Sequence, residues 1–121
     1  MALLTVRGRV TGQPHTTPVV PVKSDGQVWV VSPFGDVGWV RNVRVAGRLE
    51  LHRGDEQTTY TARELEPAEA VPVLRAYLSM PSERFVRRDF EVTSTSTDEA
   101  VEAEAGRHPV FALTSATSRS A

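Results

Sequence analysis

Residues 16–32 read TTPVVPVKSDGQVWVVS, two runs of β-branched and aromatic residues separated by an Asp-Gly pair. Asp25 and Gly26 both accept the positive φ angles of a tight two-residue turn, so the stretch predicts a β-hairpin. Pro18 and Pro21 cannot donate hydrogen bonds to a neighbouring strand, which places the first run at a sheet edge or a bulge. Because tight hairpins join antiparallel strands, we expect an antiparallel sheet.

The rest of the chain predicts further strands interleaved with helices. Alternating apolar and polar residues mark strands at residues 3–10, 48–54, 57–66 and 108–114. Helical spacing of apolar residues marks a first helix, with Val37, Val40, Val43 and Ala46 on one face and Gly47 as its end. Later helices are expected at 82–90, at 98–106 after a capping box of Ser96 and Glu99, and from Pro67, where Pro72 either kinks the helix or delays its start.

Length and composition suit one globular domain, since the chain has 121 residues of which 40% are hydrophobic. We expect a single α+β domain over residues 1–114, an antiparallel sheet curled into a small barrel with helices at its rim, and a flexible tail at 115–121. The chain has no cysteine, which excludes disulfides and thiolate chemistry. The first residues are too briefly apolar for a signal peptide or a membrane span, so a cytoplasmic location is expected.

Charge is divided unevenly along the chain. Residues 1–54 hold seven Lys/Arg and three Asp/Glu, whereas residues 55–121 hold seven and twelve, although the net charge is only −1. Thirteen of the fourteen cations are Arg, which suits bidentate contacts with phosphate or carboxylate. An anionic partner bound by the basic half would explain this pattern, and so would a high genomic G+C content with no function attached.

One segment of the basic half, GRVTGQPHTTP at residues 8–18, has the composition of an anion site. It is a Gly- and Thr-rich turn flanked by Arg9 and His15. Such a turn can hold a phosphate through backbone N–H groups, hydroxyls and a guanidinium together. A plain hairpin turn with a solvated Arg is the alternative interpretation.

A second segment, SPFGDVGWVRNVRVAG at residues 32–47, leads into the first predicted helix. Its Gly-rich start would present free N–H groups at the positive end of that helix. Trp39 and Asn42 share one helix face, and Arg41, Arg44 and Arg48 share another. Alternatively, Trp39 is a core aromatic and the Arg residues form a solvated face. If the two runs of the 16–32 hairpin pair, both segments lie beside it and would converge on a ligand with an anionic tail and a flat head.

Familiar catalytic constellations are missing from the sequence. It has no G-x-S-x-G nucleophile, no phosphate loop and no H-E-x-x-H pair. His15, His52 and His108 lie far apart at no ligand spacing, so no metal site is expected. Redox chemistry would need a bound cofactor. A nucleic-acid partner is not expected, because the few aromatic residues of the basic half form no interleaved stacking pattern.

The segments GRVTGQPHTTPVV and VVSPFGDVGWVRNVRVAG, with the ending RHPVF, resemble the deazaflavin-dependent nitroreductase family. Its members are split β-barrel proteins, FMN-binding-like in fold, that use coenzyme F-420, an 8-hydroxy-5-deazaflavin with a phosphate-linked polyglutamate tail. The resemblance covers nearly the whole chain. It implies an oxidoreductase that delivers a hydride to a flat, electron-poor acceptor such as a quinone, an enone or a nitro compound.

The resemblance also implies which residues bind the cofactor. Those near the phosphate and tail would be Arg9, Thr11, Gly12 and His15, and those framing the deazaflavin and phosphate would be Thr17, Pro18, Ser32, Gly35, Trp39 and Asn42. Many relatives carry Lys or Arg where this chain has Val10, and Arg where it has His15, so two cations are lost or become pH-dependent. Arg41 and Arg44 are expected to compensate. No catalytic residue is assigned; solvent can supply the proton, with Tyr77 and Ser32 as other candidates.

Other functions remain open from the sequence. A non-catalytic deazaflavin carrier would account for the missing cations and for a chain that begins almost at its first strand, where relatives usually have a further helix. A related split-barrel protein that binds FMN or haem is another alternative. The expected partners are a small-molecule electron acceptor and, since split barrels commonly dimerise, a second copy of the chain, with a monomer as the alternative. A lipid quinone as acceptor would imply peripheral membrane association.

Overall fold

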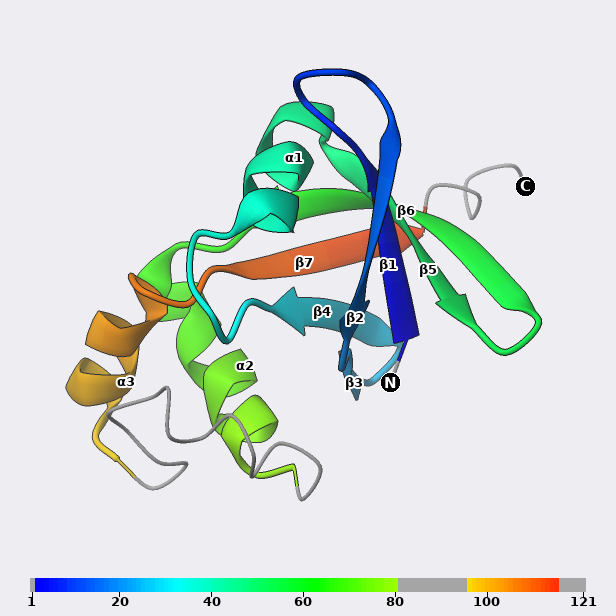
Figure 1. Ribbon diagram of the computed structural model, residues 1–121. Helices are drawn as coiled ribbons and strands as arrows, with labels where there is room; N and C mark the ends of the chain where they lie inside the picture. Colours follow the sequence, from blue (N-terminus) through cyan, green and yellow to red (C-terminus); the bar gives the residue numbers. More distant parts are fainter. Residues whose placement is uncertain (1, 81–95, 116–121) are drawn as a thin grey trace.

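The computed structural model describes residues 2–80 and 96–115, which form an antiparallel sheet with helices at one end (Figure 1). The strands of this part of the chain are β1 (Ala2–Arg7), β2 (Pro14–Val19), β3 (Val22–Ser24), β4 (Gln27–Val31), β5 (Arg48–Arg53), β6 (Glu56–Glu64) and β7 (Val110–Ser115). The helices are α1 (Gly38–Ala46), α2 (Pro67–Leu78) and α3 (Asp98–Ala105). The α+β class predicted from the sequence is confirmed.

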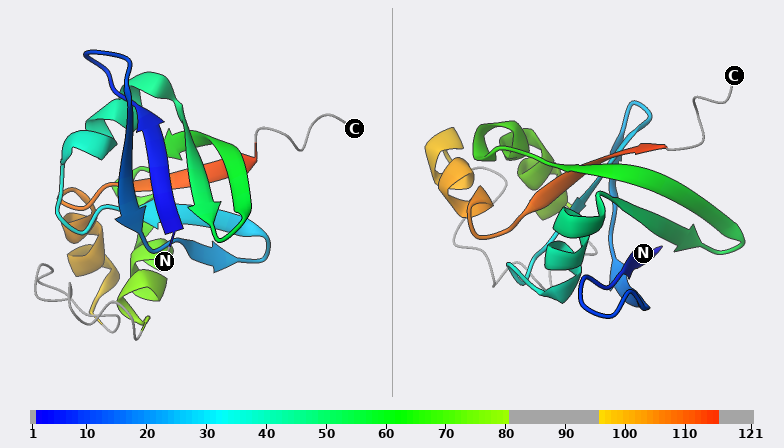
Figure 2. Two further views of the ribbon diagram at one scale, coloured as in Figure 1. Left: turned by 45° about the vertical axis from the view of Figure 1, so that its right-hand side comes forward. Right: turned by 90° about the horizontal axis from the view of Figure 1, so that it is seen from above.

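The strand order β2-β1-β5-β6-β7-β4-β3 places two segments that are adjacent in the chain at opposite edges of the sheet. The β2-β1-β5 part crosses over the β7-β4-β3 part, so the sheet curls into the half-barrel of a split β-barrel (Figure 2). The stretch 16–32 was predicted to form one hairpin, and this is only partly correct. Its first run is divided at Pro21, because β2 pairs with β1 while β3 pairs with β4.

Local turn chemistry accounts for two hairpins of the sheet, and the one at Asp25-Gly26 was predicted from the sequence. Asp25 and Gly26 join β3 to β4 with φ angles of 52° and 80°, as an Asp-Gly turn requires. Gly54, with a φ of 58°, lies in the turn between β5 and β6. Pro18 lies on β2, which is an edge strand, as its missing N–H predicts.

Two hydrophobic clusters lie on opposite faces of the central strand β7. Val110 joins a cluster made with α2, α3 and β3, whereas Phe111 joins a cluster made with α1, β1 and β5. Because successive side chains of a strand point to opposite faces, one strand supports both clusters. The second cluster lies under α1 and therefore positions the helix that carries Trp39 and Asn42.

The three described helices lie where the sequence predicted them, but some of their ends differ from the prediction. Gly47, at a φ of 72°, closes α1 and donates its N–H to the Val43 carbonyl over 2.8 Å. Arg48 therefore belongs to β5 and does not extend the Arg face of the helix. Helix α2 continues through Pro72. The N-cap of α3 is Thr97, whose hydroxyl accepts from the Ala100 N–H, so the predicted capping box at Ser96 is wrong by one residue.

The helix expected at 82–90 and most of the expected tail lie outside the described residues. Strand β1 ends at Arg7, three residues earlier than predicted, because the chain turns away there into the loop 8–13.

Candidate functional site

A cavity of about 650 Å³ lies between the β1–β2 loop, strand β2 and the first turn of α1. Its lining residues are Gly8, Arg9, Val10, Thr11, His15, Thr16, Thr17, Val37, Gly38, Trp39 and Asn42. Both segments that the sequence predicted as anion-binding therefore contribute to one cavity. They meet because α1 packs against β1, and not because both flank the 16–32 hairpin as expected.

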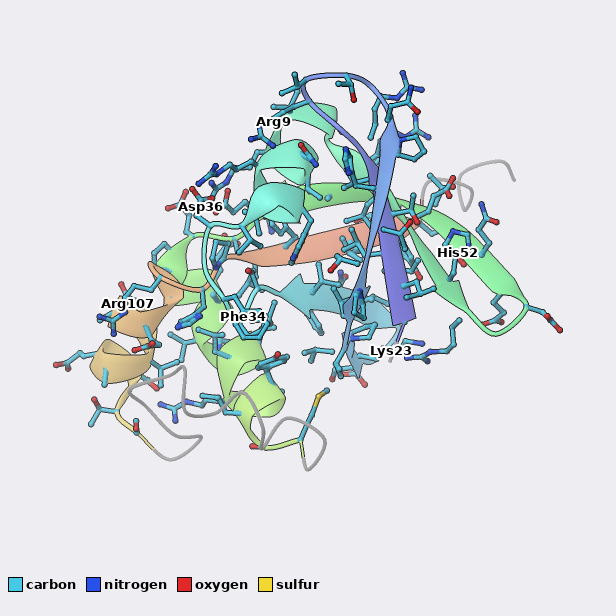
Figure 3. All side chains as sticks on the ribbon, viewed as in Figure 1. Arg9, Lys23, Phe34, Asp36, His52 and Arg107 are labelled. Carbon is cyan, nitrogen blue, oxygen red and sulfur yellow. The ribbon has the colours of Figure 1, made fainter. Side chains whose placement is uncertain are left out.

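Arg9 and Asn42 tie the two walls of the cavity together. The Oδ1 atom of Asn42 accepts from the Arg9 backbone N–H at 3.1 Å and from its guanidinium at 2.8 Å. Asn42 is only 6% exposed, so its amide is oriented by packing as well as by these bonds. Arg9 is exposed and lies beside α1 (Figure 3), which leaves the rest of its guanidinium available for an anionic ligand.

The loop between β1 and β2 is closed by its own hydrogen bonds. The Gly8 N–H donates to the Gln13 carbonyl at 2.8 Å, and the Gly12 N–H donates to the Gly8 carbonyl at 3.1 Å. The imidazole of His15 covers Gly8, because a Cβ atom at Gly8 would lie 2.7 Å from His15 Nε2. Glycine at this position is therefore what allows His15 to lie at the cavity wall.

The opposite wall is the start of α1. Val37 precedes the helix without a side-chain cap. Among the described residues, no hydrogen-bond acceptor meets the N–H groups of Gly38 and Trp39, which line the cavity at the positive end of the helix dipole. Trp39 packs against Phe111 with ring centroids 6.0 Å apart, so it is both a core aromatic and a cavity wall.

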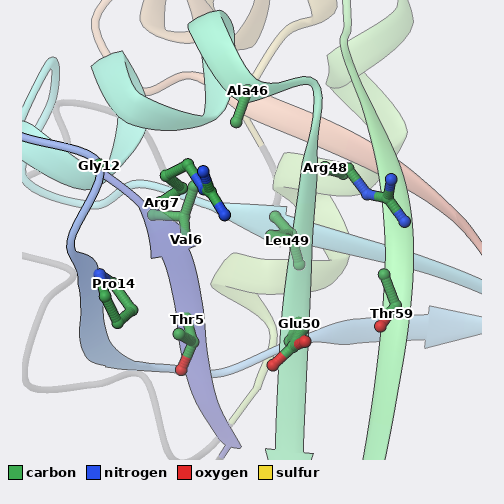
Figure 4. Close-up of a pocket in the computed structure, with 10 residues that line it drawn as sticks. All are labelled: Thr5, Val6, Arg7, Gly12, Pro14, Ala46, Arg48, Leu49, Glu50 and Thr59. Atoms are coloured by element: carbon green, nitrogen blue, oxygen red, sulfur yellow. The ribbon is translucent and has the colours of Figure 1, made fainter. Parts of the chain in front are cut away.

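Six of the ten predicted site residues line this cavity: Arg9, Thr11, His15, Thr17, Trp39 and Asn42. The other four, Gly12, Pro18, Ser32 and Gly35, do not. Gly12 instead lines a neighbouring cavity of about 580 Å³ against β1 and β5, together with Arg7 and Arg48 (Figure 4). Six of the predicted residues thus lie together at the first cavity, and four do not.

Ser32 and Gly35 make contacts with other residues of the protein and not with the cavity. Ser32 is fully buried, and its hydroxyl donates to the Gly35 carbonyl over 2.5 Å. Gly35 has a φ of 85°, and a Cβ atom there would approach the Arg107 carbonyl to 3.3 Å. Both residues therefore shape the turn that precedes α1, and neither presents a group to the cavity.

Arg41 and Arg44 do not line the cavity, which corrects the expectation that they replace the missing cations. Arg44 forms a forked ion pair with Glu64 at 2.8 Å and a second ion pair with Asp36, to which Arg41 also lies within 3.5 Å. The hydrogen bonds that the Arg44 guanidinium donates to Glu64, with the charges of Glu64 and Asp36, raise the pKa of Arg44 above its ordinary range. These Arg residues fix α1 to β6 and to the preceding turn.

Buried Glu104 and His108 were not identified from the sequence as part of the site. His108 Nε2 lies 2.9 Å from Glu104 Oε1, and His108 Nδ1 lies 3.3 Å from the Ser32 carbonyl. Both residues lie near the junction of α3 and β7, and His108 contacts the turn before α1 through the Ser32 carbonyl. The i, i+4 spacing of a Glu and a His was the one available signal, and it is too common to be specific.

A model of the F420H2-dependent quinone reductase family matches residues 1–111. The chain belongs to this family. The matched residues include the segments that resemble deazaflavin-dependent reductases.

Solved structures similar to this family member share its fold. A protein described as an F420-H2 dependent reductase (FDR-A) is 23% identical, with 93% of this chain and 92% of that chain aligned and a TM-score of 0.64. A structure described as a domain-swapped dimer is 22% identical over 93% and 78% of the two chains, also with a TM-score of 0.64. A pyridoxinephosphate oxidase family protein from Clostridium acetobutylicum is 11% identical over 94% and 73%, with a TM-score of 0.62. These likenesses confirm the split β-barrel.

The helices of this family member are short. Within residues 2–80 and 96–115, none has the length and apolar composition that a membrane-crossing segment needs.

Proposed function

We propose that the protein is a reductase that binds coenzyme F-420 in the cavity between the β1–β2 loop and α1. The observation that carries this proposal is the Arg9–Asn42 link, which holds a Gly- and Thr-rich basic loop against the start of a helix. Family membership supports the choice of a deazaflavin over FMN.

The chemistry of the cavity wall fits a ligand with a phosphate and a flat ring. Arg9, His15 and the hydroxyls of Thr11 and Thr17 supply donors at one side, and the N–H groups at the start of α1 supply more. Trp39 supplies an apolar wall for a planar ring. No Asp or Glu is among the described residues that line the cavity, so no carboxylate there opposes an anion.

A bound reduced deazaflavin supplies a hydride, because carbon replaces the flavin N5. The residues of this chain bind, orient and shield the ring. The acceptor gains two electrons and one proton with the hydride, and a second proton completes its reduction. Tyr77 and Ser32 are buried and do not line the cavity, so we infer that solvent supplies the second proton.

The acceptor we propose is a flat, electron-poor molecule such as a quinone, an enone or a nitro compound. Titration with oxidised coenzyme F-420 beside FMN, followed by ligand fluorescence, should show preference for the deazaflavin. Mixing the protein with reduced coenzyme F-420 and menadione should oxidise the cofactor faster than a protein-free blank. Failure to reduce any member of a quinone, enone and nitro panel would overturn the enzymatic role.

A deazaflavin carrier is the second candidate, and the sparse charge of the cavity favours it. Arg9 and His15 are the basic residues among the described lining residues, and Val10 at the loop tip is 85% exposed without a charge. Tight binding of coenzyme F-420 without oxidation by any acceptor would select this role.

We also propose a homodimer in the cytoplasm. A structure similar in fold is described as a domain-swapped dimer, which supports self-association without establishing it for this chain. Light scattering after size-exclusion chromatography would decide between a monomer and a dimer.

A further inference from the structure

We infer that the buried pair Glu104–His108 positions the start of α1, and with it one wall of the cavity. The role of that cavity in binding a cofactor rests on the proposed function, whereas the positioning of α1 does not. Neither residue touches the cavity, so both would act through the turn at residues 32–37.

The start of α1 needs an external support. Its N-cap residue, Val37, makes no capping bond from its side chain, and residues 32–37 contain no regular secondary structure. A helix end without a cap leaves backbone groups unpaired and is easily displaced. The position of Gly38 and Trp39 at the cavity wall must therefore come from the contacts of the preceding turn.

Those contacts are made with residues 107–109. The Ser32 N–H donates to the Pro109 carbonyl at 2.9 Å, and the Ser32 carbonyl accepts from His108 Nδ1 at 3.3 Å. Gly35 packs closely against the Arg107 carbonyl, from which a Cβ atom at Gly35 would lie only 3.3 Å away. The Gly35 carbonyl then accepts from both the Ser32 hydroxyl and the Val37 N–H, which leads directly into α1.

Glu104 holds His108 in the orientation that this chain of contacts needs. Its Oε1 atom lies 2.9 Å from His108 Nε2, and its Oε2 atom accepts from the Arg107 guanidinium at 2.5 Å. Glu104 is 1% exposed and His108 is 5% exposed. The His108 ring therefore lies between the Ser32 carbonyl and the Glu104 carboxylate.

A buried polar pair of this kind adds little stability, because desolvation of its groups offsets their attraction. What it provides is a defined geometry, since a buried charge tolerates few arrangements of its partners. Support of this kind beneath a binding site keeps the groups in direct contact with a ligand in register. The Glu104–His108 pair meets that description for the wall formed by α1.

Two substitutions of His108 separate positioning from simple loss of a buried residue. The Asn amide in H108N can occupy the place of Nδ1 and still donate to Ser32, whereas the Gln amide in H108Q reaches toward Glu104 and loses the Ser32 bond. Val101→Ala is the matched control, because Val101 is a fully buried α3 residue that belongs to the cluster of α2 and α3 and not to the cluster under α1.

The first measurement is amide hydrogen exchange of the ligand-free protein. In H108Q, we expect exchange at residues 37–42 to be accelerated about fivefold or more relative to the amides of β5. In H108N, which keeps the Ser32 bond but loses the contact with Glu104, we expect a smaller acceleration, and in V101A a ratio near that of wild type. If H108Q does not fold, Glu104→Gln takes its place, since it removes the carboxylate that orients His108. An unchanged exchange ratio in the variant used would overturn the inference.

The second measurement is the dissociation constant for oxidised coenzyme F-420. We expect it to rise about fivefold in H108Q, to rise by less in H108N, and to change less than about twofold in V101A. Equal weakening in all three variants would show a general effect of stability and overturn the inference. If the wild-type protein does not bind coenzyme F-420, the proposed function fails, while hydrogen exchange still decides the role of Glu104–His108.

Discussion

At the scale of single residues, one amide oxygen joins the two halves of the candidate site. Asn42 Oδ1 accepts from the backbone and the guanidinium of Arg9, so its loss affects a loop 33 residues earlier in the chain. Both partners were predicted from the sequence as site residues. Their direct contact was not, because an interaction between a hairpin loop and a helix leaves no periodic pattern.

Asn42→Ala should loosen the β1–β2 loop and weaken binding of coenzyme F-420. Removing the buried acceptor leaves the Arg9 N–H without its partner, which costs about 1–3 kcal/mol of unfolding free energy. Asn42→Asp keeps an acceptor for both donors, so it should lose less stability, yet it places a negative charge beside the ligand. Denaturation in urea and a binding titration would test this, and wild-type affinity in both variants would contradict it.

Gly8→Ala should displace the His15 ring. The added methyl group would lie 2.7 Å from His15 Nε2, closer than any real contact, whereas the same group at Gly12 would meet no atom within 4 Å. We therefore expect G8A to destabilise the fold by about 1–3 kcal/mol and His15→Ala to recover much of that loss in the double variant. Additive effects of the two substitutions in thermal denaturation would argue against this contact.

At the scale of elements, the ends of helices and turns follow local chemistry. Gly47 closes α1, and the Asp25-Gly26 pair turns β3 into β4, each as the sequence predicts. The separation of β2 from β3 was missed, because a run of β-branched residues looks the same whether it continues in one strand or changes partners. The residue pattern thus predicts where strands lie better than it predicts which strands pair with each other.

Helix α2 should lose part of its support in acid. The hydrogen bonds from Arg63, and then the bond from the Glu66 N–H, hold the pKa of Glu69 below its ordinary value. A depressed pKa in the folded state means that ionised Glu69 stabilises the protein above that value, and that this contribution disappears as the pH falls through it.

Glu69→Gln provides the comparison, because Gln can still accept from the Glu66 N–H. The melting temperature of wild type should exceed that of E69Q at about pH 6, and the two should converge near about pH 2.5. A difference of the same size at both pH values would contradict the assignment.

At the scale of the whole molecule, β7 connects the candidate site to the core. The Phe111 ring packs against the Trp39 ring on one face of β7. Val110, on the other face of β7, belongs to the cluster of α2 and α3. The sequence predicted an antiparallel sheet with helices and a strand at 108–114. It did not reveal that one strand serves two cores, because that depends on the curvature of the complete sheet.

Phe111→Ala should weaken ligand binding more than another core substitution that lowers the unfolding free energy by a similar amount. Both F111A and Leu113→Ala create cavities in the cluster under α1, with expected losses of about 3–5 and 2–5 kcal/mol. The Phe111 ring packs against the Trp39 ring, so F111A should reduce the affinity of the folded protein more than L113A does. Equal affinities of the two folded variants would show that Trp39 needs no support.

The prolines of β2 affect how readily the protein aggregates at high concentration. Strand β2 bonds to β1 on one side, and Pro14 and Pro18 lie two positions on either side of Thr16 along it. A proline fits into a hydrogen-bonded strand only where its backbone nitrogen, which carries no hydrogen, points away from the neighbouring strand. The unpaired edge of β2 therefore offers few N–H groups to a strand of another molecule. This border should resist fibril growth even though it is open.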